Sequence, residues 1–383
     1  MTASEFLTER ELAIEAAVCI TCGLDDISKH YPEKVLDAAS KQYSHGIRFR
    51  ELLMLAAREN GHSGFSTADV GVIFDAAFAV RASSGYSTMN IPGILSNVAN
   101  KFLNVGFLAV ETGFHTIAAK RSAPDFKQSA SYSLTGDLKY ELVGPAGEIK
   151  SGTLGEAKYT NQLQTYGKLL RISRTDIIND DLGVFASAAR NLGRGAGLSL
   201  NKLFWATFLG SVSTMFTSGN GNVVTGAGSA LSATSLGLAA QALRKQTDPD
   251  GNPLGVNLRI LLVPPELEIV ADGLMHSTAF SAGGSSTVTQ VPTSNMFAGK
   301  YQVVAASYLS NGNFTGYSTT AWYLLADPLD IATMETSWLN GRDFPTIETA
   351  EADRSTLGIN MRAYHDVGIA TQEFRAGVRA AGA

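Results

Sequence analysis

The chain has 383 residues, 45% of them hydrophobic and 17% charged, with a net charge of −5 at pH 7, which is enough for a large core and for two or three domains. It contains no basic run and no apolar window of about 18 residues, which excludes a dedicated nucleic-acid-binding face and a membrane span. The low charge is typical of a protein that buries much of its surface against copies of itself, and the polar, acidic start predicts a chain without a secretory signal, made and used in a reducing cytosol.

The first hundred or so residues predict short helices. Stretches with apolar residues at helical spacing begin near Thr8, Pro32, Phe49, Ala68 and Pro92. Thr8 and Glu11 have the spacing of a capping box, and Pro32 suits the first turn of a helix because its missing N–H would be unpaired there anyway. We therefore expect a small helical unit at the N-terminal end of the chain.

The two cysteines, Cys19 and Cys22, lie in the apolar context C-I-T-C. A zinc site needs two further ligands at suitable spacing, and a thioredoxin-like motif needs a strand before it and a helix after it. Neither context is visible, so we expect two buried thiols.

From Lys127 to Ser173 the apolar period changes to two, and G-P-A-G-E at 144–148 predicts a turn. The two arms of this hairpin carry few large apolar residues. A long hairpin that cannot bury a face on its own body needs a neighbour. We interpret it as an arm that reaches another subunit; an exposed hairpin without function is the alternative.

The stretch from Asn179 to Gly210 carries apolar residues at steps of three and four, which predicts a helix of roughly 45 Å. Asp180 and Asp181 at its start are typical capping residues rather than metal ligands. Glycines at 193, 195 and 197 each cost about 0.5–1 kcal/mol relative to alanine, so we expect another backbone to cross closely or the helix to bend there. Two shorter helices broken at the glycines are the alternative.

Beyond this spine the sequence predicts an α/β subdomain and then strands. S-G-N-G-N-V-V-T-G-A-G-S-A at 218–230 lacks the G-K-[ST] of a phosphate-binding loop and indicates a flexible loop. A helix at 235–245, a turn at 248–251, a strand at 258–263, a helix from Pro265, a loose loop at 281–289 and a strand at 301–306 follow. Strands at 321–325, 331–339, 359–364 and 368–374 are expected to form one antiparallel sheet on the spine, which makes the fold class α+β.

Enzyme chemistry finds little support in the sequence. None of the six histidines lies in H-E-x-x-H or another ligand spacing, and no G-x-S-x-G nucleophile elbow occurs. G-H-S-G at 61–64 resembles one only in its letters, since adjacency of His62 and Ser63 does not make a working pair. We therefore expect no catalytic residue, no cofactor and no metal.

Several motifs together resemble the major capsid proteins of tailed bacteriophages, in the branch related to the Mu-type major head protein and often fused behind a Clp-like prohead protease. The matching motifs are D-F-K at 125–127, Y-G at 166–167, S-R-T-D-I-I-N-D-D-L-G-V-F at 173–185, Q-T-D-P-D-G at 246–251, L-L-V-P-P at 261–265, A-W-Y-L-L-A-D-P at 321–328, L-N-G-R…P-T-I-E at 339–348, R-A-Y-H-D-V-G-I-A at 362–370 and Phe374-Arg375. Two departures occur. The family's aspartate–tryptophan–arginine–glycine appears as Glu373-Phe374-Arg375-Ala376, and the protease part is absent, so the chain should not process itself.

The resemblance implies an HK97-like phage capsid fold with a long spine helix, an extended β-hairpin arm (the E-loop), an axial α/β domain and a peripheral antiparallel sheet. The implied divisions are an N-terminal helical segment or N-arm at 1–65, the N-arm and start of the peripheral domain at 66–126, the E-loop at 127–173, the spine helix at 174–214, the axial domain at 215–310, and the peripheral sheet and C-terminus at 311–383. Residues 1–65 are either a scaffold-like segment removed on maturation or an arm retained in the shell.

The implied function is that of a structural virion protein whose copies form hexamers and pentamers of an icosahedral head around double-stranded DNA. Expected partners are the chain itself, a portal, a prohead protease and decoration proteins, with no membrane, and assembly in the bacterial host cytoplasm. Intersubunit contacts are expected at the mixed charges of the arm, Lys139, Glu141, Glu148, Lys150, Glu156 and Lys158. On the spine helix the expected residues are Asp180, Asp181, Phe185, Arg190 and Phe204. The alternatives are the same fold in a gene-transfer particle or an encapsulin-like compartment, and, less favoured, an uncharacterised hydrolase.

Overall fold

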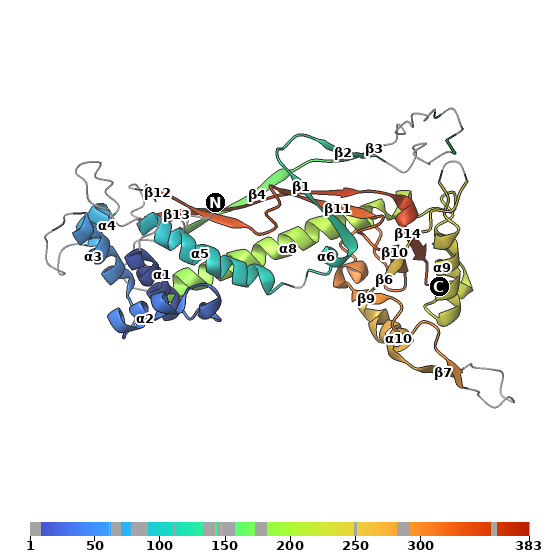
Figure 1. The fold of residues 1–383 in the computed structure, drawn as a ribbon, viewed down its shortest axis with the longest axis horizontal. Helices are drawn as coiled ribbons and strands as arrows, with labels where there is room; N and C mark the ends of the chain where they lie inside the picture. The colour runs from blue at the N-terminus through green and yellow to red at the C-terminus, as the bar shows by residue number, and fades with distance from the viewer. Residues whose placement is uncertain are drawn as a thin grey trace. The chain divides into compact units, whose positions relative to one another are not determined.

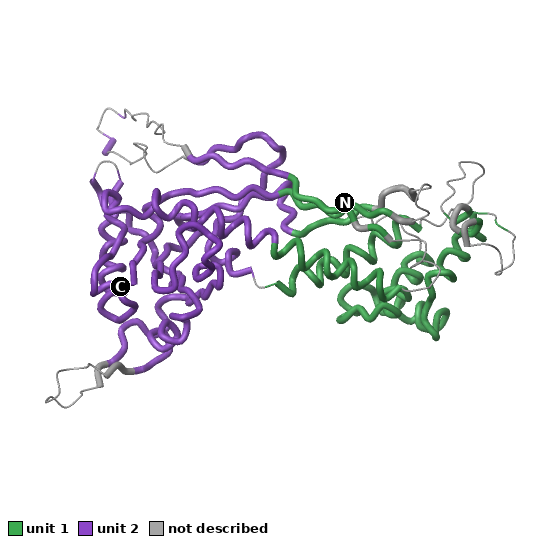
Figure 2. The backbone as a smooth tube through the Cα atoms, turned by 180° about the vertical axis from the view of Figure 1, so that it is seen from behind, with its two compact units in different colours: residues 1–111, 165–198, 344–366 green, residues 112–164, 199–343, 367–383 purple. Residues whose placement is uncertain are grey.

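The computed structural model describes residues 9–60, 62, 70–77, 91–110, 112–132, 142–143, 147, 158–172, 182–248, 251–281, 292–353 and 358–382 (Figure 1). The chain forms two compact units (Figure 2). Unit 1 comprises residues 1–111, 165–198 and 344–366, and unit 2 comprises residues 112–164, 199–343 and 367–383. Each unit thus collects segments that lie far apart in the sequence.

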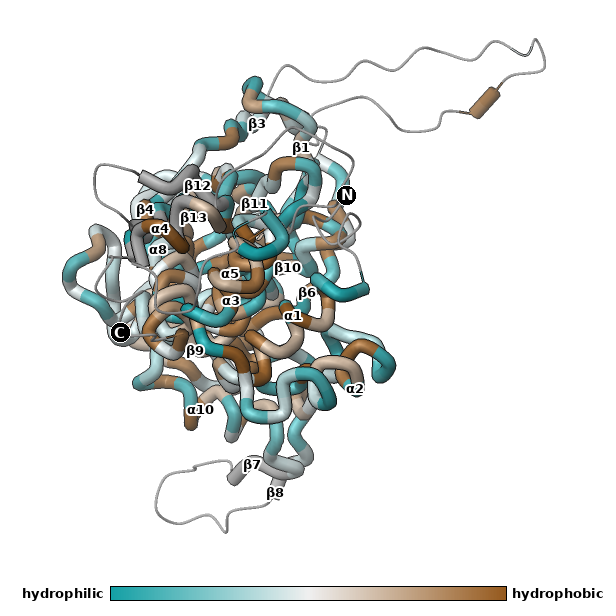
Figure 3. The backbone as a smooth tube through the Cα atoms, turned by 90° about the vertical axis from the view of Figure 1, so that its left-hand side faces the viewer, coloured by the Kyte–Doolittle hydropathy of each residue, from teal (hydrophilic) through white to brown (hydrophobic). Residues whose placement is uncertain are grey.

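Unit 1 is built on helices from the N-terminal part of the chain. They are α1 (Glu9–Thr21), the 3-10 turn η2 (Ile27–Lys29), α2 (Glu33–Gln42), α3 (Phe49–Glu59), α4 (Val70–Ala77) and α5 (Ile91–Leu108). Hydrophobic residues gather where α1, α3 and α5 lie together (Figure 3). Ile14, Leu52, Leu95 and Phe102 are fully buried in this core. The expected N-terminal helices are therefore confirmed, and they share one core with α5 and with Leu182 and Phe185 further along the chain.

Local signals set the bounds of these helices. Pro32 is the N-cap of α2, one position before the first turn in which it was expected, and Thr8 lies outside the described residues. At the start of α3 the Glu51 carboxylate accepts a hydrogen bond from the Arg48 amide at 3.1 Å, which pairs one of the N–H groups that a helix end leaves open. The Asn60 amide after α3 donates to the carbonyls of Ala76 and Ala77 and so ties α3 to the end of α4.

Helix α8 (Leu182–Met215) is continuous through its three glycines, so the alternative of two shorter helices is wrong. Within unit 1 it crosses α5 at close range, and Gly193 and Gly197 face α5 at this crossing. This confirms the expectation that another backbone passes near the glycines. Gly195 is exposed, and among the described residues no atom from outside its own turn of helix lies within 4 Å of a Cβ built there.

Unit 1 also contains strands β12 (Thr346–Asp353), β4 (Gln164–Ile172) and the first part of β13 (Gly358–Thr371). β12 runs antiparallel to β13, from Thr346 opposite Tyr364 to Asp353 opposite Gly358, and β4 pairs with β13 as well. β12 was not predicted from the sequence. The assignment of residues 164–172 to the hairpin is wrong, because these residues pair with β13.

Asn100 of α5 fastens β12 to the helical core. Its side-chain amide donates to the Ile347 carbonyl at 2.8 Å, and its amide oxygen accepts from the Ile347 N–H at 2.7 Å. Both backbone groups of Ile347 are thus paired, as buried backbone requires.

Unit 2 contains a five-stranded mixed sheet in the order β5-β14-β10-β6-β9. Its strands are β5 (Val223–Val224), β14 (Gly377–Ala380), β10 (Trp322–Ala326), β6 (Leu258–Val263) and β9 (Gln302–Ala305). α9 (Ala233–Arg244) and α10 (Pro265–His276) share a core with Leu261, Trp322 and Leu324 of this sheet. Tyr323, which lies between Trp322 and Leu324 in β10, points to the other face of the sheet, where its ring lies 5.3 Å from that of Phe208 in α8.

The expected helix–strand–helix order of the α/β subdomain is confirmed, and Pro265 does open α10. The expectation of a loose loop at 218–230 is wrong. This stretch contains β5 and the 3-10 turn η3 (Ala227–Ser229). The Asn222 side chain donates to the carbonyls of Met215 and Phe374, and the Trp322 indole donates to the Ser229 carbonyl at 2.9 Å.

The remaining sheet of unit 2 joins β1 (Ala118–Ala123), β11 (Met334–Leu339) and the last part of β13. β1 is parallel to β11, and β11 is antiparallel to β13 from Met334 opposite Thr371 to Trp338 opposite Val367. The expectation that the last strands form one antiparallel sheet is therefore wrong in detail. β10 and β14 belong to the sheet that carries α9 and α10, because their apolar faces cover the core under those helices.

Short elements complete unit 2. They are α6 (Phe114–Ile117), β7 (Ala279–Ser281), β8 (Pro292–Ser294), η4 (Ser307–Ser310) and η5 (Phe374–Ala376). Residues 282–291, where most of the second loose loop was expected, lie outside the described residues. Within the described parts of the chain, no helix combines the length and the apolar character needed to cross a membrane. The α+β class is confirmed.

Candidate assembly site

A two-stranded ribbon in unit 2 forms the root of the predicted arm. β2 (Ser129–Tyr132) runs antiparallel to β3 (Lys158–Asn161), with Ser129 opposite Asn161 and Tyr132 opposite Lys158. Among the described strands, these two pair only with each other. The hairpin is thus confirmed at its base, and its returning strand ends at Asn161.

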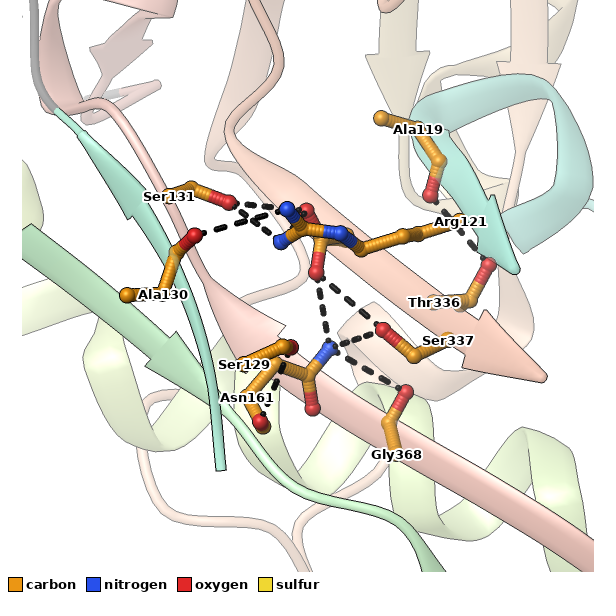
Figure 4. A network of polar contacts seen from close by, with 10 residues as sticks. Ala119, Arg121, Ser129, Ala130, Ser131, Asn161, Thr336, Ser337 and Gly368 are labelled. Atoms are coloured by element: carbon orange, nitrogen blue, oxygen red, sulfur yellow. Dashed lines mark hydrogen bonds and ion pairs between the residues drawn. The ribbon is translucent and has the colours of Figure 1, made fainter. Parts of the chain in front are cut away.

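The carboxylate of Glu335 binds both strands of this ribbon, through the side chains of Ser131 and Asn161 that Figure 4 labels. Its Oε2 atom accepts a hydrogen bond from the Ser131 hydroxyl of β2 at 3.3 Å. Its Oε1 atom accepts one from the Asn161 amide of β3 at 3.1 Å. The two oxygens of the Glu335 side chain therefore bind different strands of the arm.

Arg121 of β1 adds positive charge to the same site. Its guanidinium donates to the Ser131 hydroxyl at 2.7 Å and to the Ala130 carbonyl at 3.4 Å, and it stands 3.5 Å from the Glu335 carboxylate. Guanidinium groups suit such a place because their rigid fork donates to several acceptors at once. β1 is thereby fastened to β2 as well as to β11.

The contacts of Glu335 matter for stability because this carboxylate is buried. Glu335 is 7% exposed and Asn161 is 4% exposed. A buried charge is costly unless it is paired and hydrogen-bonded. Ser337 completes the set, since its hydroxyl donates to Glu335 at 3.1 Å and accepts from Asn161 at 2.9 Å. The Glu335 carboxylate therefore accepts from four donors. Arg121, Ser131 and Asn161 come from three other strands, and Ser337 comes from its own strand.

The chain that leaves β3 passes tightly over β13. A Cβ atom at Gly368 would stand 2.6 Å from the Asn161 side-chain oxygen and 2.7 Å from the Gln162 carbonyl. No side chain fits in that space, so glycine is required where the root of the arm lies on the sheet.

The predicted arm residues Lys139, Glu141, Glu148, Lys150 and Glu156 lie outside the described residues. Lys158 is the first residue of β3. Its placement at the root agrees with an arm position, and the intersubunit role of all six charges remains a prediction.

The predicted spine residues fall into separate surroundings. Asp180 and Asp181 lie outside the described residues, immediately before α8. Phe185 is buried in the core of unit 1, and the Arg190 guanidinium lies 5.5 Å from the ring of Phe102 in α5. Phe204 is fully buried in unit 2, where its ring stacks on Phe114 at 5.1 Å.

Arg121, Asn161 and Glu335 were not predicted from the sequence. The only signal for Glu335 is a pair of polar residues at alternate positions, Glu335 and Ser337, in a strand that also carries the apolar residues Met334, Trp338 and Leu339. This spacing puts both side chains on one face of the strand. Nothing in the sequence connects that face to residues 121 or 161.

Other chemistry is sparse in the described parts of the chain, where no cluster of three His, Cys, Asp or Glu side chains has the arrangement of a metal site. Cys19 is a buried free thiol, as expected, whereas Cys22, also expected to be buried, is only partly buried. Burial raises the pKa of Cys19 to about 11 and that of Cys22 to about 12. His62 is described, but Ser63 beside it is not.

The described residues form a protein of mixed helix and sheet that carries the root of a two-stranded hairpin. Residues 157–380 match the sequence family described as phage capsid protein. Since this match covers more than half of the chain, the chain belongs to that family of phage capsid proteins and is a capsid subunit. The resemblance to phage capsid proteins is confirmed, and the HK97-like fold and the Mu-type branch remain predictions.

Solved structures with a similar course of the chain are capsid and particle proteins. The virus-like particle of Pyrococcus furiosus shares 10% identity, with 75% of this chain and 97% of that chain covered and a TM-score of 0.41. The capsid of cyanophage P-SCSP1u shares 13% identity over 70% and 86%, with a TM-score of 0.45. The procapsid of bacteriophage JBD30 shares 14% identity over 75% and 73%, with a TM-score of 0.36. No curated protein matches the sequence.

Proposed function

We propose that this capsid subunit is the main shell protein of a tailed-phage or prophage head. Its copies form hexamers and pentamers that close around double-stranded DNA in the bacterial host cytoplasm. A portal, a prohead protease and decoration proteins are its further partners. Such shells are structural, and the proposal assigns the chain no catalytic step.

The observation that carries the proposal is the ribbon of β2 and β3, anchored by a buried carboxylate at its root. Two-stranded hairpins are marginally stable alone in water, so a long one needs a surface to lie on. The anchor fixes the base of the ribbon within unit 2. The rest of the hairpin, between β2 and β3, would then reach a neighbouring copy.

Contacts between copies must be heterologous for rings of five and six to form from one chain. The arm carries both signs of charge, with Lys139, Lys150 and Lys158 against Glu141, Glu148 and Glu156. Exposed ion pairs contribute only about 0–1 kcal/mol each. Cohesion of a shell would therefore come from many repeated contacts rather than from one strong pair.

The charge of the chain suits a container for DNA. Proteins that grip DNA do so by neutralising phosphates with clustered Lys and Arg. A net charge of −5 without a basic run gives a wall that does not hold its cargo. The DNA could then be packed and released without breaking protein–phosphate contacts.

Electron microscopy and light scattering of the purified chain test the proposal. Closed shells tens of nanometres across, or rings of five and six copies, are the expected products. The ratio of absorbance at 260 and 280 nm of the particles reports nucleic acid, and a particle free of it would favour a protein compartment. A uniform monomer or dimer at all concentrations, also with co-expressed portal and protease, contradicts the proposal.

A further inference from the structure

We propose that Glu335 is a positioning residue that sets the direction in which the arm leaves the subunit, before any neighbour binds. The inference rests on the proposed function, because the arm it orients would contact a second copy of the chain. It starts from the division of one carboxylate between two strands, with Oε2 bound by Ser131 and Oε1 by Asn161.

The two attachments constrain the ribbon more than one would. A single hydrogen bond to one strand leaves a two-stranded ribbon free to pivot about that bond. Because the carboxylate is planar and its two oxygens hold different strands, both the spacing and the rotation of the strands at the root are fixed. Arg121 adds a third attachment at the backbone of β2, through the Ala130 carbonyl at 3.4 Å.

The packing at Gly368 also fixes the root of the arm, and it does so without involving charge. The Asn161 side chain and the Gln162 carbonyl lie directly on the Cα of Gly368, where even a methyl group would meet both at 2.7 Å or less. The turn out of β3 is therefore pressed against β13 while Asn161 is held by Glu335. Polar anchoring and close backbone contact fix the same point.

An arm that already points in its binding direction loses less conformational freedom when a neighbour binds. Since the contact recurs at every subunit of a shell, a small change in each contact gives a large change in the concentration at which shells form. Glu335 would thus act on assembly through the geometry of the arm, without touching the neighbour.

The test is Glu335→Gln, which keeps the size of the side chain and removes its charge. We expect a folded subunit whose amides at 129–132 and 158–161 exchange hydrogen at least about tenfold faster. We expect its threshold concentration for shell formation to rise at least about tenfold. Ser131→Ala, which removes only the attachment of β2, should shift both quantities in the same direction even if Glu335→Gln fails to fold.

The matched control is Glu348→Gln, since the Glu348 carboxylate on β12 of unit 1 accepts a hydrogen bond from the Tyr364 hydroxyl at 2.7 Å and lies outside the anchor. It should leave exchange at the arm root and the threshold unchanged. Wild-type exchange and threshold in both Glu335→Gln and Ser131→Ala would overturn the role of Glu335. A wild-type chain that forms no shells contradicts the proposed function instead, and the exchange rates then still decide whether Glu335 anchors the arm.

Discussion

Gly193 of α8 lies against the backbone carbonyl of Leu103 in α5, so closely that a Cβ atom at position 193 would stand 1.9 Å from the carbonyl oxygen. The contact is reciprocal one turn away, where a Cβ at Gly106 of α5 would stand 1.9 Å from the Arg190 carbonyl of α8. Each helix thus has a glycine in direct contact with the backbone of the other helix. This crossing joins α8 to the N-terminal helices through the core of unit 1.

Gly193→Ala should lower the free energy of unfolding by about 3 kcal/mol, because the new methyl group meets backbone that cannot move aside without separating the helices. Gly195→Ala is the matched control two residues away, where no described neighbour comes within 4 Å of the added Cβ. That substitution should raise the stability by about 0.5–1 kcal/mol, since alanine is the better helix former. Urea denaturation of the two variants measures both effects, and equal effects would contradict the close crossing.

The spine illustrates what sequence patterns can predict. Apolar residues at steps of three and four predicted a helix at 179–210, and α8 runs over Leu182–Met215 because its stripe finds a core in each unit. The glycines, unfavourable for a helix alone, correctly predicted a close crossing. They could not tell which helix crosses, because that depends on residues some ninety positions earlier in the chain.

The arm root shows where such patterns stop. Period-two alternation predicted the ribbon, and its base is present. The anchor depends on Arg121, Asn161 and Glu335, which meet only because β1 and β11 pair in parallel across more than two hundred residues. β12 was missed for a similar reason, since its backbone pairs with β13 and with Asn100 of a helix. Long-range pairing of this kind leaves no local signal.

The buried carboxylate of Glu15 gives a second prediction. It accepts hydrogen bonds from Tyr31 at 2.6 Å and Asn97 at 3.0 Å and is paired with the Lys101 ammonium. Glu15→Ala should cost about 2–4 kcal/mol of stability, because it leaves these donors and the charge of Lys101 without a partner. Lys101 keeps some contact with solvent, which places the cost below that of a fully buried pair.

Thermal and urea unfolding of Glu15→Ala measure this cost. Glu9→Ala is the control, since Glu9 pairs with Lys34 on the surface, where both side chains are about four-fifths exposed. Exposed pairs contribute about 0–1 kcal/mol, so this variant should unfold close to the wild type. Similar losses in the two variants would show that the buried network adds nothing.

The thiols of Cys19 and Cys22 should be unreactive in the folded protein. Burial raises the pKa of Cys19 to about 11, from the ordinary 9.0, and the thiolate is the reactive form. At pH 8 the thiolate fraction of Cys19 should be about 100-fold lower than in the unfolded chain. A disulfide-exchange reagent that labels both cysteines at pH 8 in urea should therefore label the native protein very slowly, and rapid native labelling would contradict the burial.

The same shifts predict a dependence of stability on pH. The unfolded thiols ionise near pH 9, below the folded values of about 11 and 12, so the unfolded state loses protons first as the pH rises. Their contribution is complete below pH 9 and is lost as the pH rises toward 11 and 12. Unfolding of the wild type and of the Cys19→Ala, Cys22→Ala double variant from pH 7 to 11 measures it. Equal slopes above pH 9 would argue against the shifts.

The N-terminal helices should remain in the mature particle rather than be removed as a scaffold. α1 buries Ile14, Val18 and Cys19 completely, against residues of α5, α8 and β12 in the core of unit 1. Full burial of each large apolar side chain is worth about 1.5–3 kcal/mol, so cleavage followed by loss of α1–α3 would open the core. The Cys22 thiol, 3.5 Å from the Leu182 carbonyl at the start of α8, lies at the same contact.

Mass spectrometry of intact protein from purified particles checks this prediction. The expected mass includes all residues from Glu9 onward, and limited proteolysis of the free subunit should leave α1, α2 and α3 uncut, because a protease needs locally unfolded chain. Both expectations depend on the hydrophobic contacts that hold α1. Ile14→Ala should therefore speed proteolysis within residues 9–60 and lower the free energy of unfolding by about 2–5 kcal/mol. A subunit mass that corresponds to a chain starting beyond residue 60 would show instead that these helices act only before maturation. The apolar surface of α5 and α8 that α1 covers would then have to pack against something else.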